Sequence, residues 1–264
     1  MAANERDRTA YPLARTAKTI RTMKDRNKII PGRNYGSIPH LSDSKLGKHD
    51  KYIHEGQERI IREGGRDKHD VVIVSLKLDG TNVGVVKKDG QLVTLQRKGY
   101  DCASSPYRQH HEFDKWVHEN YAAFDSLLSE GERVVGEWMW QASGIKYKIQ
   151  GPPFFAFDLF RADGNRAAWS ELVLAVDNTP FTTPIHFVYS RAVLMKVNDY
   201  SRSNFPPAQP LDGLRHEGWI YRVERKGKFD FMAKWVRPDF EPGKYLPGLC
   251  GNPVDAPLVL NELA

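Results

Sequence analysis

The chain has 264 residues, of which 40% are hydrophobic and 11% are aromatic. This content is sufficient for a buried core and too high for a disordered chain. The length fits one large domain with extensions better than two equal domains. We find no export signal and no apolar run of membrane-spanning length, so we expect a cytoplasmic protein without a membrane partner. The cysteines, Cys102 and Cys250, lack metal-ligand spacing and are expected to be reduced thiols.

Basic residues outnumber acidic ones, with 39 Lys and Arg against 33 Asp and Glu and a formal net charge of +6. A basic excess suits a polyanionic partner, although many other proteins share an excess of this size. Part of it is clustered near the N-terminus, within residues 18–28. We interpret this cluster as a solvated arm in preference to a nucleic-acid contact.

The first predicted elements are one helix and a group of strands. Apolar spacing predicts a single helix over residues 50–63. A meander of three antiparallel strands is predicted over residues 71–77, 83–86 and 92–97. The dipeptides Asp79-Gly80 and Asp89-Gly90 lie between these strands and are typical of tight hairpin turns.

The pattern then changes to a helical period, which predicts one amphipathic helix over residues 106–128, lying across the sheet. Further strands are predicted over residues 133–140, 154–160, 218–224 and 229–236, and a helix over residues 169–176. The segment 178–215 gives no clear pattern, and the chain after Pro238 is expected to wrap the surface. Because strands outnumber helices and their links are short, we predict an α+β fold of antiparallel sheets flanked by helices.

Lys77 ends a hydrophobic strand, and its chemistry depends on the side chains that share its face. Side chains alternate along a strand, so Ile73, Ser75, Lys77 and Asp79 should point one way. An ammonium is no nucleophile, because its lone pair holds a proton. Burial and a nearby metal cation would lower the pKa of Lys77 toward neutrality. Taken alone, a surface lysine paired with Asp79 is the simpler interpretation.

Further motifs favour a nucleophile. Residues 77–82, Lys-Leu-Asp-Gly-Thr-Asn, resemble the nucleophile motif of the covalent nucleotidyltransferases, which comprise DNA ligases, RNA ligases and mRNA capping enzymes. Other segments resemble the later motifs of that superfamily, in its order and on predicted strands: residues 135–138, 155–159, 217–222 and 233–237. Asn82, where DNA ligases and capping enzymes usually have arginine, and the upstream segment 35–41 indicate the ATP-dependent RNA ligase family.

The resemblance covers residues 70–240 and implies a domain organisation. A nucleotidyltransferase (ATP-grasp-like) catalytic domain is expected over residues 66–240. It would be preceded by an N-terminal extension, residues 1–65, which either packs on it or extends from it, and followed by a C-terminal tail, residues 241–264. That tail is too short for the OB fold that such ligases often append.

The resemblance also implies a reaction, in which a lysine attacks the α-phosphate of ATP with the help of Mg²⁺, or Mn²⁺ as the alternative ion. Lys77 would be the nucleophile. The carboxylates of Asp79, Glu137 and Glu217 would face the metal through water, and Lys234 would neutralise charge on the α-phosphate. The expected catalytic residues are therefore Lys77, Asp79, Glu137, Glu217 and Lys234.

The nucleotide itself would contact a partly different set of side chains. Arg97 is expected at the ribose or a phosphate, and Asn82, Lys77, Glu137 and Lys234 are also expected to bind the nucleotide. Phe157, which we expect on one strand face with Phe155 and Leu159, would stack on adenine. The AMP would then pass to an RNA 5′-phosphate, which is sealed to a 3′-hydroxyl. The expected partner is nicked or broken RNA with these ends, and the expected state is a monomer.

One position departs from the family pattern. The last motif usually carries a second lysine, where this chain has Val236. Either one phosphate contact is absent or a nearby cation replaces it, for which the candidates are Arg222, Lys226 and Lys228. Lysines that could line an RNA path are Lys87, Lys88, Lys98, Lys146 and Lys148. A DNA ligase, a capping-type nucleotidyltransferase and a non-catalytic nucleic-acid-binding relative are the competing interpretations.

Overall fold

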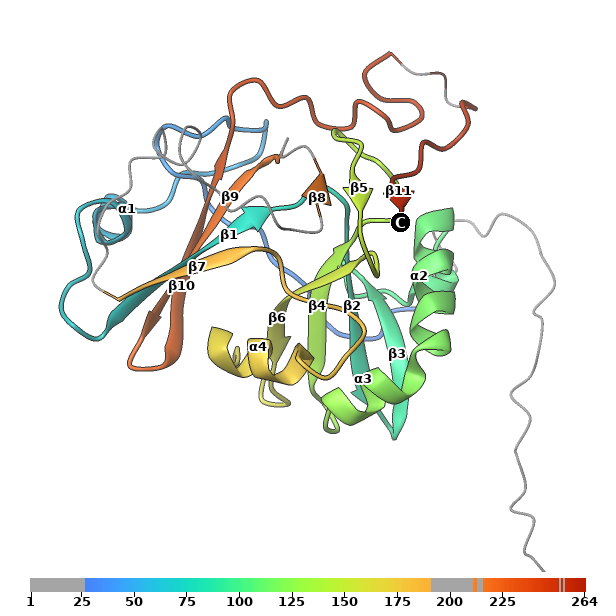
Figure 1. Cartoon of the computed structure of the whole chain (residues 1–264), viewed down its shortest axis with the longest axis horizontal. Coiled ribbons are helices and arrows are strands. Elements are labelled where there is room, and N and C mark those ends of the chain that lie inside the picture. Colours follow the sequence, from blue (N-terminus) through green and yellow to red (C-terminus); the bar gives the residue numbers. More distant parts are fainter. Residues whose placement is uncertain (1–26, 191–210, 213–215, 252, 254) are drawn as a thin grey trace, which may run out of the picture.

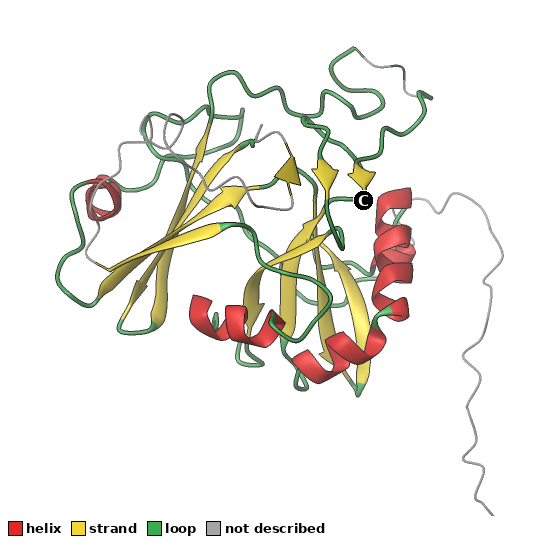
Figure 2. Cartoon of the chain, viewed as in Figure 1, coloured by secondary structure: helices red, strands yellow, loops and turns green. Residues whose placement is uncertain are grey.

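The structure is a computed structural model, and it describes residues 27–190, 211–212, 216–251, 253 and 255–264. Two four-stranded sheets lie side by side, with helices packed against them (Figures 1 and 2). The strands of the first sheet are, in spatial order, β10 (Lys228–Val236), β9 (Gly218–Arg225), β1 (Asp70–Lys77) and β7 (His186–Ser190). Those of the second are β3 (Gln91–Gln96), β2 (Thr81–Lys88), β4 (Arg133–Trp138) and β6 (Phe154–Phe160). The predicted α+β class with antiparallel sheets is confirmed.

The side chains of β1 alternate between the two large hydrophobic cores of the described structure, which we call the first and the second core. Val72, Val74 and Leu76 pack on one side with α1 (Glu55–Arg62), β9 and β10. Ile73 points to the other side, into the core beneath the second sheet. The predicted faces of this strand are therefore confirmed, and Lys77 is its last residue, paired with Gly218 of β9.

The predicted three-strand meander is wrong at its first turn. β2 and β3 form the predicted hairpin, and Asp89 and Gly90 at its tip both have positive φ. The other neighbour of β2 is β4, however, and not β1. Asp79-Gly80 therefore carries the chain from one sheet to the other. Gly80 is needed there for close packing, because a Cβ would lie 2.6 Å from the Trp138 carbonyl oxygen.

The predicted helix over residues 106–128 is in fact two helices, α2 (Arg108–Glu119) and α3 (Tyr121–Leu127). Asn120 breaks the helix at φ −111° and ψ 25°, and its side chain donates to the Trp116 carbonyl at 2.9 Å. Such local bonding competes with a continuous helix. Phe113 and Phe124 on these helices are fully buried in the core of the second sheet. The predicted packing across a sheet is confirmed.

Other boundaries also differ from the prediction. α1 begins only at Glu55, because the His54 side chain caps it by accepting from the Gly56 amide at 3.2 Å. β4 ends at Trp138, whereas α4 (Trp169–Val176) has the predicted limits. No sequence pattern had indicated β7 or a small third sheet, which consists of β11 (Glu262–Leu263), β5 (Lys148–Ile149) and β8 (Leu211–Asp212).

The last residues of the chain are held against the body of the molecule. β11 pairs in parallel with β5. The Asn261 side chain donates to the Met139 carbonyl at 2.7 Å and accepts from the Tyr147 amide at 2.8 Å. Within the described part of the chain, no helix has the length and apolar character needed to cross a membrane. Apart from Lys28, the basic N-terminal cluster lies outside the described residues.

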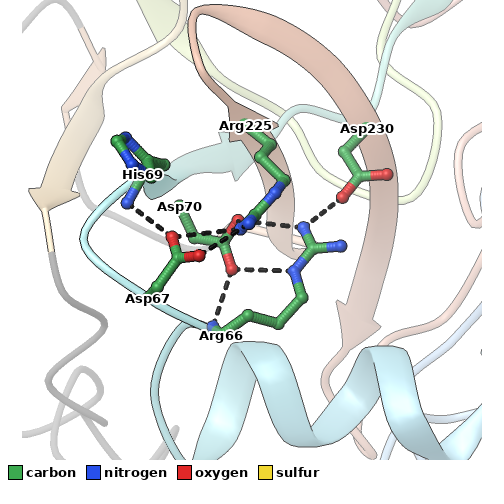
Figure 3. Close-up of polar contacts among 6 residues, drawn as sticks. All are labelled: Arg66, Asp67, His69, Asp70, Arg225 and Asp230. Carbon is green, nitrogen blue, oxygen red and sulfur yellow. Dashed lines mark hydrogen bonds and ion pairs between the residues drawn. The ribbon is translucent and has the colours of Figure 1, made fainter.

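An ion-pair cluster fixes the start of β1, at the end remote from Lys77 (Figure 3). Asp70 has no exposed side-chain surface and accepts from Arg66 Nε and Nη2 at 2.9 Å each and from Arg225 Nη1 at 2.8 Å. Arg66 also contacts Asp230 in β10, so the cluster joins three segments. Burial would raise the pKa of Asp70, but its bonds from Arg66 and Arg225 outweigh burial and lower the pKa to about 2.

We predict that Asp70→Asn lowers the free energy of unfolding at pH 7 by about 2 kcal/mol, because charge-assisted bonds to a buried acceptor are lost. The folded pKa lies below the usual 3.8, so this stabilisation is present above pH 4 and is lost as the pH falls toward 2. Urea unfolding at pH 7 and pH 3 measures both effects. Asp67→Asn, in the loop before β1 and also paired with Arg225 but exposed, is the control and should change stability far less. An equal loss in both variants would contradict this role of Asp70.

Candidate active site

The ends of β1 and β10 in the first sheet face strands of the second sheet across a pocket. Lys77 and Lys234 come from the first sheet. Asn82 and Glu137 are register partners on β2 and β4 of the second sheet. The inner pocket, as we call it, is lined by all four of these residues and by Arg97 and Phe157. The outer pocket adjoins it and adds Asp79 and Glu217. The eight residues singled out in the sequence thus all line these two pockets.

Lys77 lies where the two pockets meet, and its side chain is 22% exposed. Its Nζ forms an ion pair with Glu217 Oε2. Burial alone would lower the pKa of Lys77, but the nearby carboxylates of Glu217 and Glu137 outweigh burial and raise it. Burial is therefore not sufficient to lower this pKa, and the part of the expectation that rests on a nearby metal cation stays a prediction.

The three carboxylates around Lys77 are crowded together with little compensating charge. Burial, together with the charges of Asp79 and Glu217, raises the pKa of Glu137 to about 8, although Lys77 and the Gly80 amide act to lower it. The pKa values of Asp79 and Glu217 are also raised, first by burial. Asp79 Oδ2 is fixed by the amides of Gly144 at 2.5 Å and Ile145 at 3.1 Å. The site therefore favours additional positive charge.

The side chains of the described residues are not arranged to coordinate a metal ion directly, without water. Among the described residues, no three His, Cys, Asp or Glu side chains are grouped closely enough to hold an ion. One oxygen of each carboxylate is already engaged, as Glu137 Oε1 accepts from the Gly80 amide at 3.1 Å and Glu217 contacts Lys77. The chemistry of this donor set fits an ion that keeps most of its water, such as Mg²⁺.

The inner pocket has an aromatic wall, and here the predicted strand face is wrong. β6 bulges opposite Val135 and Gly136 of β4, and Phe157 is the extra residue. Phe157 is therefore separated from Phe155 and Leu159, which lie in the two large cores. It packs instead with Tyr35 at 5.0 Å between ring centroids, half-buried at the pocket.

Polar atoms of the inner pocket are open to a ligand. Asn82 Oδ1 is buried and has no hydrogen-bond partner in the described structure. A buried polar atom without a partner is costly unless something else supplies the bond. Arg97 follows β3, is exposed, and makes only 3.4 Å contacts to the Gly36 carbonyl and Ser37 Oγ. Both side chains can thus bind a polar molecule without first breaking strong contacts.

Lys234 is held by a hydrogen-bonded chain that sequence reasoning missed. Its Nζ lies 3.5 Å from Asp50 Oδ1, and Asp50 Oδ2 lies 2.9 Å from His40 Nε2. His40 Nδ1 lies 2.6 Å from Ser44 Oγ, which accepts from the Val236 amide at 2.8 Å. The ionised carboxylate of Asp50 can only accept, so a neutral His40 ring donates its Nε2–H to Asp50 and accepts the Ser44 hydroxyl proton at Nδ1.

Backbone pairing brings this chain of contacts to β10. The Lys234 amide donates to the Pro39 carbonyl and the Leu41 amide donates to the Lys234 carbonyl, both at 2.9 Å. Burial and Lys234 lower the pKa of His40, so the ring is neutral. In the sequence, the segment 35–41 is linked to the site only by its resemblance to a family segment, and nothing in the local pattern predicts a pairing with residue 234. That pairing is a long-range contact.

The cation proposed to replace the second lysine of the last motif is not found among the expected candidates. Val236 is buried in the first core. Arg222 is also buried, and its three guanidinium nitrogens donate to Glu224, Asp158 and the Ala167 carbonyl. Lys226 and Lys228 belong to the β9–β10 turn, beside His69, at the opposite end of the strands from Lys234.

Only one of the five lysines expected on an RNA path lies at the site. Lys98 lines the outer pocket. Lys87 is paired with Asp125 at 2.7 Å and Lys146 with Glu262 at 3.3 Å. Lys88 and Lys148 line neither pocket.

Comparison with known proteins agrees with the motifs. A family model described as RNA ligase matches residues 70–236. Because this match covers more than half of the chain, the chain belongs to the RNA ligase family. No curated protein matches it.

Similar solved structures include an archaeal ATP-dependent RNA ligase, at 18% identity and a TM-score of 0.39, covering 63% of this chain and 42% of that one. A Naegleria gruberi RNA ligase with PPi has 14% identity and a TM-score of 0.46, and covers 84% of this chain and 62% of that one. A Naegleria gruberi variant with ATP and Mn has 16% identity, a TM-score of 0.44, and coverages of 76% and 61%. The chain thus spans less than two thirds of each of these proteins.

Proposed function

We propose that this member of the RNA ligase family is an ATP-dependent enzyme that forms a covalent lysyl–AMP on Lys77, passes the AMP to an RNA 5′-phosphate and seals that end to a 3′-hydroxyl. The observation that supports it best is the position of Lys77. It lies at the junction of two pockets, in contact with Glu217 and flanked by Glu137, Asp79 and Lys234. The inner pocket, with the ring of Phe157, lies on one side of Lys77, and the outer pocket lies on the other.

The inner pocket supplies the contacts that a nucleoside requires. Phe157, supported by Tyr35, offers a ring for the adenine. Asn82 Oδ1 offers an unused acceptor, and Glu137 lies opposite it for the ribose hydroxyls. Arg97 and Lys234 place positive charge where phosphates would follow.

The first step forms a bond between Lys77 Nζ and the α-phosphorus of ATP, and pyrophosphate leaves. Nζ must lose its proton first, and Glu217 is in contact to take it. Asp79, Glu137 and Glu217 would face the waters of a bound Mg²⁺ or Mn²⁺. When bound, that ion supplies positive charge that favours the free amine and balances the phosphates. Lys234, oriented by Asp50, would stabilise charge on the α-phosphate.

We predict that the wild-type protein, incubated with α-labelled ATP and Mg²⁺, becomes covalently labelled, and that Lys77→Ala removes the label. The reason is that Lys77 places its amine at the junction of the pockets, in contact with a carboxylate that can take its proton. Gel electrophoresis under denaturing conditions measures the label. Lys87→Ala, a lysine paired elsewhere, is the control and should label normally. An unlabelled wild type would instead support a non-catalytic nucleic-acid-binding relative.

The choice of nucleotide and of strand separates an RNA ligase from a DNA ligase and from a capping-type nucleotidyltransferase. We expect labelling with ATP and little with GTP, and sealing of nicked RNA in preference to nicked DNA. Labelling from GTP would indicate a capping-type nucleotidyltransferase, and preferential sealing of DNA would indicate a DNA ligase.

We predict that Phe157→Ala raises the ATP concentration for half-maximal labelling about tenfold, since stacking of a base on an aromatic ring contributes about 1–3 kcal/mol. Titrating ATP in the labelling assay measures the change. Phe157→Trp keeps an aromatic surface and should remain close to wild type. If the alanine variant needs no more ATP than wild type does, adenine binds elsewhere.

We predict that Asp50→Ala slows lysyl–AMP formation at saturating ATP about tenfold, as is usual when a group that orients an active residue is lost. The ATP concentration for half-maximal rate should change much less, because Asp50 positions Lys234 and does not face the nucleoside. Asp43→Ala, in the same segment but paired with Arg62, is the control. Equal rates for Asp50→Ala and wild type would contradict the role of this chain of contacts.

A further inference from the structure

The outer pocket is larger than the inner pocket and lies outside the part of the site that the proposed nucleoside would fill. It has a volume of about 660 Å³ against about 160 Å³ for the inner pocket. The two pockets share Lys77, Asn82, Arg97, Glu137 and Lys234. With a nucleoside in the inner pocket, as in the proposed function, any molecule that reacts with a group on Lys77 has to approach through the outer one.

The charges of the outer pocket are unevenly arranged. Asp79 and Glu217 lie near Lys77. Arg97 and Lys98, consecutive residues after β3, bring two exposed cations, and no acidic side chain of the described residues forms an ion pair with either. Unpaired cations at a pocket rim attract an anion without the cost of breaking an existing ion pair. A terminal phosphate is the anion that the proposed reaction must bring to this place.

Tyr107 adds an exposed aromatic ring to the same pocket. The residue is 55% exposed and precedes α2. Its backbone amide donates to Ser105 Oγ at 3.1 Å, and Ser105 Oγ lies 2.6 Å from His110 Nδ1. The His110 ring packs edge-on against the tyrosine ring, with 6.1 Å between centroids. The ring is thus supported from one side while much of its surface is left exposed. An exposed ring beside cations is how proteins bind single-stranded nucleic acids.

We propose that the outer pocket binds the 5′-phosphate end of the acceptor strand, with its phosphate at Lys98 and, once pyrophosphate has left, at Arg97, and with its first base stacked on Tyr107. A phosphate oxygen would then attack the phosphorus of the lysyl–AMP. An oxygen–phosphorus bond forms, the bond to Lys77 Nζ breaks, and the released amine takes a proton from solvent. This inference rests on the proposed function and extends it to the second substrate.

The test separates AMP transfer from lysyl–AMP formation. The full chain is first loaded with labelled AMP, and a 5′-phosphorylated RNA oligonucleotide is then added over a range of concentrations. We expect Tyr107→Ala to form lysyl–AMP at the wild-type rate but to need about ten times more RNA for half-maximal transfer, because the stacking of the first base is lost. Lys98→Ala should also weaken transfer, and more so at low salt than at high salt.

Two variants serve as controls. Tyr107→Phe keeps the ring and should transfer AMP as wild type does. Tyr52→Ala removes a tyrosine that is equally exposed, at 53%, but lines a separate hollow beside α1, and it should have no effect. Normal loading with unimpaired transfer in Tyr107→Ala would overturn this inference alone, as would an equal loss in Tyr52→Ala. A wild-type chain that accepts no AMP would overturn the proposed function together with it.

Discussion

The site depends on a buried ion pair that joins the two sheets. Arg222 of β9 and Asp158 of β6 are almost completely buried, and Arg222 Nη1 lies 3.0 Å from Asp158 Oδ1. The other donors of Arg222 bind Glu224 Oε1 at 2.7 Å and the Ala167 carbonyl at 2.5 Å. Such a pair is tolerated only when its hydrogen bonds are satisfied, and loss of one partner leaves a buried charge. Asp158 follows Phe157 directly in the chain. The ion pair that joins the two sheets therefore also fixes the backbone next to the aromatic ring of the inner pocket.

The ion pair between Arg222 and Asp158 is important because neither sheet contains all the residues of the site. Lys77 and Lys234 belong to one sheet, whereas Asn82, Glu137 and Phe157 belong to the other. The result is a cluster of carboxylates around a single amine, which holds the pKa of Lys77 above its usual value. The acidic groups thus outnumber the positive charges around Lys77. The cation and the triphosphate of the proposed reaction would balance the charges of the site when both are bound. An unfavourable local charge balance of this kind is common where binding or catalysis occurs.

Much of this was predictable from the sequence where local pattern decides the structure. The alternation in β1, the Asp89-Gly90 hairpin and the β9–β10 pair follow from period and turn chemistry, and the ordered motifs identified the residues that line the pockets. The predictions are wrong where contacts between residues far apart in the sequence determine the local structure. Asp79-Gly80 has the composition of a hairpin turn but crosses between sheets. The bulge at Phe157 and the pairing of Pro39 and Leu41 with Lys234 depend on strands that are far away in sequence.

The proposed covalent bond between Lys77 and AMP can be tested directly. The most direct measurement is mass spectrometry of the protein after reaction with unlabelled ATP and Mg²⁺, followed by proteolysis and fragment sequencing. We expect a mass increase of one adenylyl group, localised to Lys77 and removed when pyrophosphate is added. An unmodified protein, or an adenylyl group on a different residue such as Lys234, would contradict this proposal.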